Sequence, residues 1–134
     1  MESTILYPMV AQSALTFGVL SLLAKRRFAA IADKSADYRY FRLFSGDGEP
    51  DHVRVVQRNL LNLFEMPMLF FIICLMAEVF GKADTVMVYA AWGYVAVRVL
   101  HSITHIVQNN VQTRFQIFMV SNIILMFMWV WVLL

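Results

Sequence analysis

Four long hydrophobic stretches, separated by polar segments, dominate the pattern along the chain. They cover residues 3–32, 51–80, 84–107 and 111–134. A helix rises about 1.5 Å per residue, and about 20 mostly apolar residues cross the hydrocarbon core of a bilayer. Each stretch is long enough to do so. The pattern therefore predicts an all-α fold, an integral membrane bundle of four helices.

The segments between these stretches are rich in turn-forming residues. The longest covers residues 33–50 and contains Ser45-Gly46-Asp47-Gly48-Glu49-Pro50, which is typical of a loop. Shorter turns are predicted at residues 81–84 and 108–110. Because short connections place consecutive helices antiparallel, the 33–50 loop and the 108–110 turn should lie on one side of the membrane. The 81–84 turn and both termini should lie on the other.

Positive charge is distributed unequally between these two sides. Seven of the eleven Lys and Arg residues lie between residues 25 and 54, whereas Lys82 belongs to the opposite side. Cytoplasmic loops of membrane proteins carry an excess of Lys and Arg. The sequence therefore predicts a multi-pass protein with the 33–50 loop in the cytoplasm and both termini on the opposite side.

Composition supports one membrane domain and excludes several other classes. The chain has 134 residues, which fits a single domain over 1–134, and 60% of them are hydrophobic, against about 45–50% in soluble domains. Its one cysteine, Cys74, lies in an apolar run, so neither a disulfide framework nor a cysteine-rich zinc site is expected. No soluble basic patch with interleaved aromatic residues is present, so nucleic acid is not an expected partner.

Polar and charged residues interrupt the hydrophobic stretches at helical spacing. They are Arg58, Asn62 and Glu65 on the second helix, Tyr94, Arg98, His101 and His105 on the third, and Arg114 at the start of the fourth. Residues at i, i+4 and i+7 share one face of a helix. The antiparallel topology places all three groups in the half of the bundle near the 33–50 loop.

These residues predict a buried site with a surplus of positive charge. A charged side chain near the centre of a membrane helix costs about 2.5–3.5 kcal/mol on insertion scales, so such residues should face the bundle interior. Three arginines and one glutamate leave a cationic surplus that an anionic ligand could fill. A structural pair of Glu65 with Arg58 or Arg98 is an alternative, because polar residues also join membrane helices without binding a ligand. His101 and His105 have the spacing of a metal pair, but no nearby carboxylate or Cys completes a site, so no metal is expected.

Three of these segments resemble motifs of a known family. Arg58 to Pro67 reads R-x-x-x-N-x-x-E-x-P, which resembles the signature of the MAPEG family, the membrane-associated proteins in eicosanoid and glutathione metabolism. Arg98-Val99-Leu100-His101 is similar to the family's R-x-x-H motif on the third helix, and Arg114 to its arginine at the start of the fourth. The resemblance covers nearly the whole chain and is strongest to a bacterial branch.

The resemblance implies a left-handed four-helix bundle that assembles as a homotrimer in the bacterial inner membrane. It implies glutathione bound between subunits near the cytoplasmic face, and a lipophilic acceptor that arrives from the bilayer. Arg114 would stabilise the glutathione thiolate, while Asn62 and Glu65 would bind the polar ends of the peptide. His101 would add a contact. Further candidates for binding glutathione are Arg58, Arg98 and His105.

The chain also departs from the pattern of catalytic family members. His105 replaces a tyrosine of the third helix, and Phe115 and Phe118 replace a serine and a tyrosine of the fourth. Three hypotheses follow. The protein is a glutathione-dependent transferase or peroxidase, a non-catalytic scaffold that binds a lipid in the same cavity, or a structural membrane protein with a paired polar core.

Overall fold

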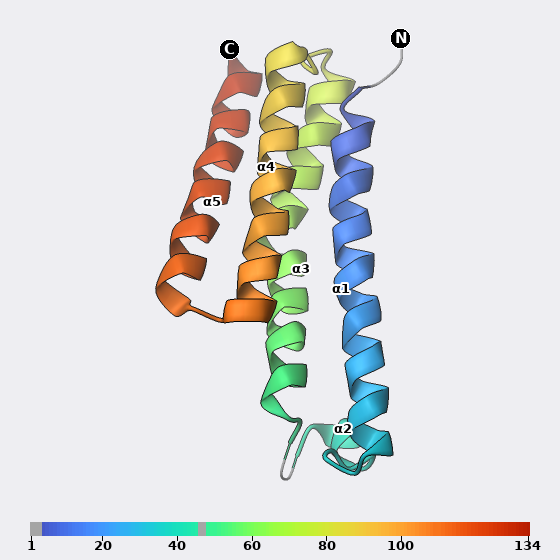
Figure 1. Ribbon diagram of the computed structural model, residues 1–134. Helices are drawn as coiled ribbons and strands as arrows, with labels where there is room; N and C mark the ends of the chain where they lie inside the picture. Colours follow the sequence, from blue (N-terminus) through green and yellow to red (C-terminus); the bar gives the residue numbers. More distant parts are fainter. Residues whose placement is uncertain (1–3, 46–47) are drawn as a thin grey trace.

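The computed structural model describes residues 4–45 and 48–134, and this part of the chain forms an antiparallel bundle of four long helices (Figure 1). The helices are α1 (Leu6–Ala32), the short α2 (Tyr40–Leu43), α3 (Asp51–Val79), α4 (Thr85–Ile103), which continues into the π-helical turn η1 (Thr104–Gln108), and α5 (Val111–Leu133). The four long helices are long and apolar enough to span a membrane. The predicted all-α membrane bundle is confirmed, and the chain is an integral multi-pass membrane protein.

The observed helix limits differ from the sequence pattern mainly in two places. First, the predicted 33–50 loop contains α2, whose residues the hydrophobic pattern did not mark as helical. Aromatic contacts explain this helix, since Phe41 and Phe44 pack edge to face and the guanidinium of Arg27 lies over both rings, 5.2 and 5.8 Å from their centroids. The predicted helix start at Ser3 and the loop residues Gly46 and Asp47 lie outside the described residues.

The second difference is the end of the third membrane span, where the α-helix changes into η1. A π-helical turn inserts an extra residue per turn and often occurs at functional sites. The turn ends at Asn109, which adopts a left-handed conformation (φ 48°) that Asn tolerates better than most residues. Asn110 then caps α5, because its side chain accepts a hydrogen bond from the amide of Thr113.

The helices pack as two antiparallel pairs. The largest contacts join α1 to α3 and α4 to α5, and α4 also packs on α1. The start of α1 and the end of α5 lie at one end of the bundle, whereas α2 and η1 lie toward the other (Figure 1). At that second end α1 and α3 extend beyond the turn between η1 and α5 (Figure 1).

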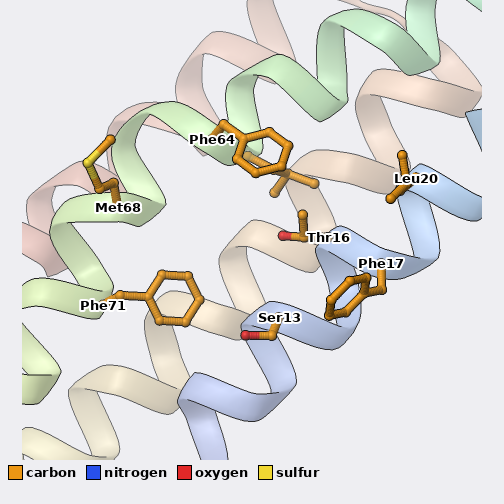
Figure 2. A pocket seen from close by; sticks show the side chains of 8 residues that line it. Ser13, Thr16, Phe17, Leu20, Phe64, Met68 and Phe71 are labelled. Atoms are coloured by element: carbon orange, nitrogen blue, oxygen red, sulfur yellow. The ribbon is translucent and has the colours of Figure 1, made fainter.

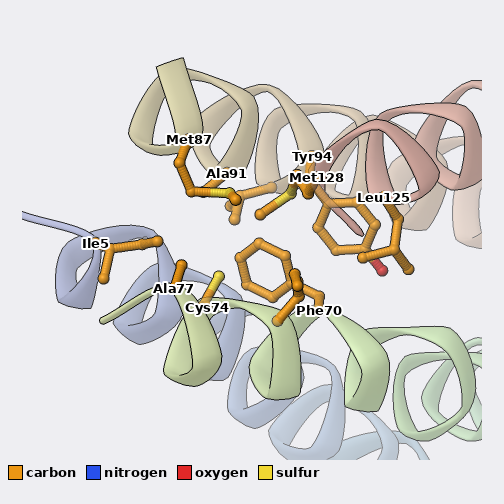
Figure 3. Close-up of a cluster of buried hydrophobic side chains, with 11 residues drawn as sticks. Ile5, Phe70, Cys74, Ala77, Met87, Ala91, Tyr94, Leu125 and Met128 are labelled. Carbon is orange, nitrogen blue, oxygen red and sulfur yellow. The ribbon is translucent and has the colours of Figure 1, made fainter. Parts of the chain in front are cut away.

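One apolar core lies in the half of the bundle near the termini (Figure 3), and a second joins α1 to α3 in the other half. The ring of Phe70 on α3 stacks on Tyr94 of α4, with centroids 4.5 Å apart. Cys74 and Ala77 follow on α3 as small buried side chains, and Ala91 on α4 is also small and fully buried. Small residues at these positions let the helix backbones approach closely. In the other half, the second core fills the space between α1 and α3, and the polar side chains lie between α3, α4 and α5.

We predict that Asp84 contributes to stability through the start of α4. Its Oδ1 accepts a hydrogen bond from the Met87 amide at 2.8 Å, and the indole Nε1 of Trp131 donates to its Oδ2 at 3.1 Å. These bonds, the Met87 bond first, lower the pKa of the Asp84 carboxyl below its ordinary value. A carboxyl whose pKa is lowered by folding stabilises the folded state at pH values above its pKa in the unfolded chain, and this stabilisation is lost as the pH falls through its pKa in the folded state.

Asp84→Ala should therefore lower the Tm in detergent at neutral pH. The difference from wild type should shrink in acid, as the pH falls below the ordinary pKa of an aspartate. Asp51→Asn is the control, because the Asp51 side chain is highly exposed and its ion pair with Arg54 is long, at 3.4 Å, and therefore weak. Equal melting of Asp84→Ala and wild type at neutral pH would contradict the prediction.

Candidate functional site

A polar cavity of about 230 Å³ lies between α3, α4 with η1, and α5, in the half of the bundle away from the termini. Its walls come from three consecutive helices whose polar residues the sequence placed at similar depth. The lining residues are Arg58, Asn62, His101, His105, Val111, Arg114, Phe115 and Phe118. Five of the seven predicted site residues therefore lie around one cavity.

Helical spacing positions the polar side chains of this cavity. Arg58 and Asn62 are one turn apart on α3, so both reach the same face. His101 and His105 are buried on the facing side, with ring centroids 5.8 Å apart and planes at 70°. His105 lies in η1, so the π-helical turn sets the direction of its ring.

Arg114 is the half-buried residue that closes the cavity from α5. Its Nη1 donates a 2.8 Å hydrogen bond to Oδ1 of Asn109, the left-handed residue that ends η1. This bond uses one N–H of the guanidinium and fixes the side chain beside the cavity. The other N–H groups of Arg114 have no bond to side chains in the described part of the chain. They are therefore available to a ligand.

Arg98 lies behind the cavity and does not line it. Its side chain is fully buried, and its Nη2 donates to Oδ1 of Asn62. The Nε and Nη1 of Arg98 have no hydrogen-bond partner among the described residues. Because Oδ1 of Asn62 faces Arg98, the amide nitrogen of Asn62 is the part left to face a ligand.

Glu65 is exposed and lies outside the cavity. Within the part of the chain that the structure describes, it forms no ion pair, so neither the Glu65–Arg58 nor the Glu65–Arg98 pair is present. Glu65 does lie on α3 at helical spacing from Arg58, as predicted, but no helix in the described part of the chain covers the face of α3 that carries Glu65. A carboxylate on the outer face of a membrane helix is costly unless another molecule covers it.

A second polar contact between α3 and α4 was not singled out from the sequence. The hydroxyl of Ser102 donates to Oδ1 of Asn59 at 3.3 Å, and both side chains are buried. The signal was present, because Asn59 interrupts an apolar stretch beside Arg58. Such interhelical hydrogen bonds stabilise contacts between membrane helices by roughly 0.6 kcal/mol on average. This contact holds α3 against α4 next to the cavity.

The chemistry of the cavity is that of an anion site. Its polar lining consists of two guanidinium groups, two imidazoles and one amide, and no carboxylate is among its lining residues. Charge-assisted hydrogen bonds from Arg to carboxylates are short and strong. Phe115 and Phe118 add an apolar wall. Among the described residues, no group of three or more His, Cys, Asp or Glu is placed to bind a metal ion.

A separate groove of about 340 Å³ lies between α1 and α3 and faces outward (Figure 2). Phe17 and Leu20 of α1 and Phe64, Met68 and Phe71 of α3 surround it (Figure 2). The two hydroxyl groups that line the groove, on Ser13 and Thr16, donate hydrogen bonds to backbone carbonyls one turn earlier on α1. The groove therefore offers an apolar surface to the bilayer.

Four candidate membrane spans with a cationic cavity in one half of the bundle define an integral membrane helix bundle with an internal polar site. The family model described as the MAPEG family matches residues 5–134, which is essentially the whole chain. The chain therefore belongs to the MAPEG family, and the resemblance inferred from its motifs is confirmed. No curated protein and no solved structure matches it. Membership supports a role in glutathione-related or eicosanoid metabolism.

We predict that Arg98 destabilises the ligand-free protein. Its buried guanidinium has a single acceptor, and a buried charge without full compensation costs several kcal/mol. Arg98→Met keeps the length of the side chain and removes the charge. It should raise the Tm in detergent, corresponding to about 1 kcal/mol or more. Arg98→Lys, which keeps the charge, should give no such gain, and a lower Tm for Arg98→Met would show that Arg98 is structural.

Proposed function

We propose that this protein is a glutathione-dependent transferase or peroxidase that acts on a lipophilic electrophile. The observation that supports this most is the cavity, where two arginines, two histidines and the Asn62 amide converge without a carboxylate. Glutathione carries two carboxylates, one ammonium and a thiol, so its negative groups match this donor set. Membership of the MAPEG family supports the same ligand.

In this proposal Arg114 is the catalytic residue. Its guanidinium lies beside the cavity with N–H groups free of other side chains of the described chain. A nearby guanidinium favours the thiolate over the thiol, and the thiolate is the nucleophile. The glutathione thiol first releases its proton to water. The thiolate sulfur then forms a bond to an electrophilic carbon of the acceptor, and the electron pair of the bond broken at that carbon takes up one proton from water. The remaining candidates bind glutathione: Arg58, Asn62, His101 and His105 in the cavity, and Arg98 through Asn62.

Glu65 supports the proposal of a homotrimer with glutathione between subunits. Its carboxylate lies on an exposed face of a membrane helix, where it is costly in lipid. A neighbouring copy would cover this face, and Glu65 would then bind the ammonium of glutathione. The basic end of the bundle supports a cytoplasmic position of the site in a bacterial inner membrane, since positive loops stay inside.

The first test is the effect of Arg114→Ala on conjugation of glutathione to a lipophilic electrophile. Removing one preorganised donor to a developing or stabilised anion reduces turnover by about 10²–10³-fold. We expect a loss of this size in Arg114→Ala, a smaller one in Arg114→Lys, and none in Lys82→Ala, which lies at the far end of the bundle. Turnover of Arg114→Ala equal to that of wild type would remove Arg114 from the mechanism.

Glu65→Gln tests the binding role of this carboxylate. A hydrogen bond to a charged group contributes about 1.5–3 kcal/mol, so the Kd for glutathione should rise by roughly tenfold or more. Glu78→Gln is the matched control on the same helix, because Glu78 is also exposed but lies near the terminal end. The oligomeric mass of each variant is measured in the same samples, and a trimer is expected. An unchanged Kd would place the ammonium elsewhere.

The second candidate function is a non-catalytic scaffold that binds a lipid in the same cavity. Phe115 and Phe118 favour it, because they give the cavity an apolar wall where catalytic relatives carry hydroxyl groups. A scaffold would retain a stoichiometric lipid after purification, detectable by mass spectrometry, and would not turn over electrophiles. Turnover that depends on Arg114 would decide for the enzyme.

A further inference from the structure

The end of the bundle away from the termini carries a basic surface that the proposed glutathione site does not use. It is formed by residues 25–45, which contain six Lys or Arg residues and two Asp. α1 has 27 residues and is about 40 Å long, whereas the hydrocarbon core is about 30 Å thick. α2 lies beside the extended end of α1 (Figure 1). The surface is therefore at the depth of the lipid headgroups.

Two of its cations hold the surface together. Arg27 donates from Nη2 and Nε to the two carboxylate oxygens of the buried Glu49, at 2.8 and 3.2 Å, and lies over the rings of Phe41 and Phe44. Arg26 donates to the backbone carbonyl of His52 at 2.6 Å. α2 is thus fixed against the ends of α1 and α3. The remaining charged side chains of residues 25–45 therefore project from a folded surface.

The other four cations of this surface are exposed and lack ion pairs within the described ranges 4–45 and 48–134. They are Lys25, Lys34, Arg39 and Arg42. The two Asp residues of the segment instead accept hydrogen bonds from backbone amides, Asp33 from Ser35 at 2.8 Å and Asp37 from Arg39 at 2.9 Å.

Arginine and aromatic side chains share one hollow on this surface. It has a volume of about 650 Å³ and is lined by Tyr38, Arg39, Phe41 and Arg42. Tyr38 is 76% exposed, and Leu43, on the other end of α2, is 77% exposed. A soluble anion needs only the two guanidinium groups. Exposed aromatic and aliphatic side chains beside them suit a ligand that has apolar chains below its charge.

We propose that this surface binds the headgroups of anionic phospholipids from the surrounding bilayer. Arg39 and Arg42 bind the phosphate, because guanidinium groups pair with phosphate oxygens in bidentate geometry. Tyr38, Leu43 and Phe44 lie among the headgroups and upper acyl chains, where amphipathic rings are favoured. The site is independent of glutathione binding and anchors the end of the bundle next to the polar cavity.

The test titrates the purified full-length protein in detergent with phosphatidylglycerol or phosphatidylcholine and follows the Tm. We expect a dose-dependent rise with phosphatidylglycerol and a much smaller one with phosphatidylcholine. Each cation near an anionic surface strengthens binding roughly five- to sixfold. The double variant Arg39→Gln, Arg42→Gln should therefore need roughly thirtyfold more phosphatidylglycerol for the same rise in Tm. Lys82→Gln, at the opposite end, should titrate like wild type.

Three results would overturn the proposal. Equal shifts with both lipids would exclude selection of the anionic headgroup. An equal shift with the same concentration of inorganic phosphate would identify a site for free anions. A double variant that titrates like wild type would exclude the two arginines. Arg39→Lys, Arg42→Lys keeps both charges but loses the bidentate geometry, so its affinity should lie between those of wild type and the Gln variant, which separates loss of binding from loss of folding.

Discussion

The hydrocarbon core of the membrane offers no water to polar groups, and the rest of this structure follows from that constraint. Backbone N–H and C=O groups must be satisfied within each segment, so the chain crosses as helices. Polar side chains must face inward and find partners. Apolar side chains such as Phe70 and Leu125 form one core near the termini, and a second core joins α1 to α3 in the other half. The polar cavity lies beside this second core, between α3, α4 and α5. Several of the buried polar atoms that lack a partner in the described chain lie in and behind the cavity.

Buried polar atoms without a partner occur around Asn62 and Arg98, and others belong to Gln12, Tyr94 and Asn122. Arg98 spends one N–H on Asn62 and keeps two donor atoms unpaired in the described chain, and the buried His101 and His105 each keep an unpaired Nδ1. A structural polar core would satisfy these groups, because unsatisfied buried donors cost about 1–3 kcal/mol each. Their retention fits a site that a ligand completes. The same reasoning applies to Glu65 in the proposed trimer, where a neighbouring copy would cover its exposed carboxylate.

Helical spacing made the fold and most of the site predictable from the sequence. Arg58 and Asn62, like His101 and His105, follow intervals that a helix turns into a shared face, so five residues were correctly expected to lie together. Spacing along one helix does not say which faces are covered, so it could not show that Glu65 is exposed within the single chain or that Arg98 lies behind the cavity. α2 depends on contacts of Arg27 with distant aromatic rings, which no local pattern reports.

The central claim is that a cationic cavity inside the membrane bundle holds glutathione as its thiolate. The most direct measurement is the ultraviolet absorbance of thiolate when glutathione is added to the purified protein in detergent at neutral pH. We predict an absorbance change that saturates at one thiolate per bound glutathione in wild type and is absent in Arg114→Ala. Glutathione that binds wild type without any thiolate absorbance, or that does not bind at all, would contradict the account.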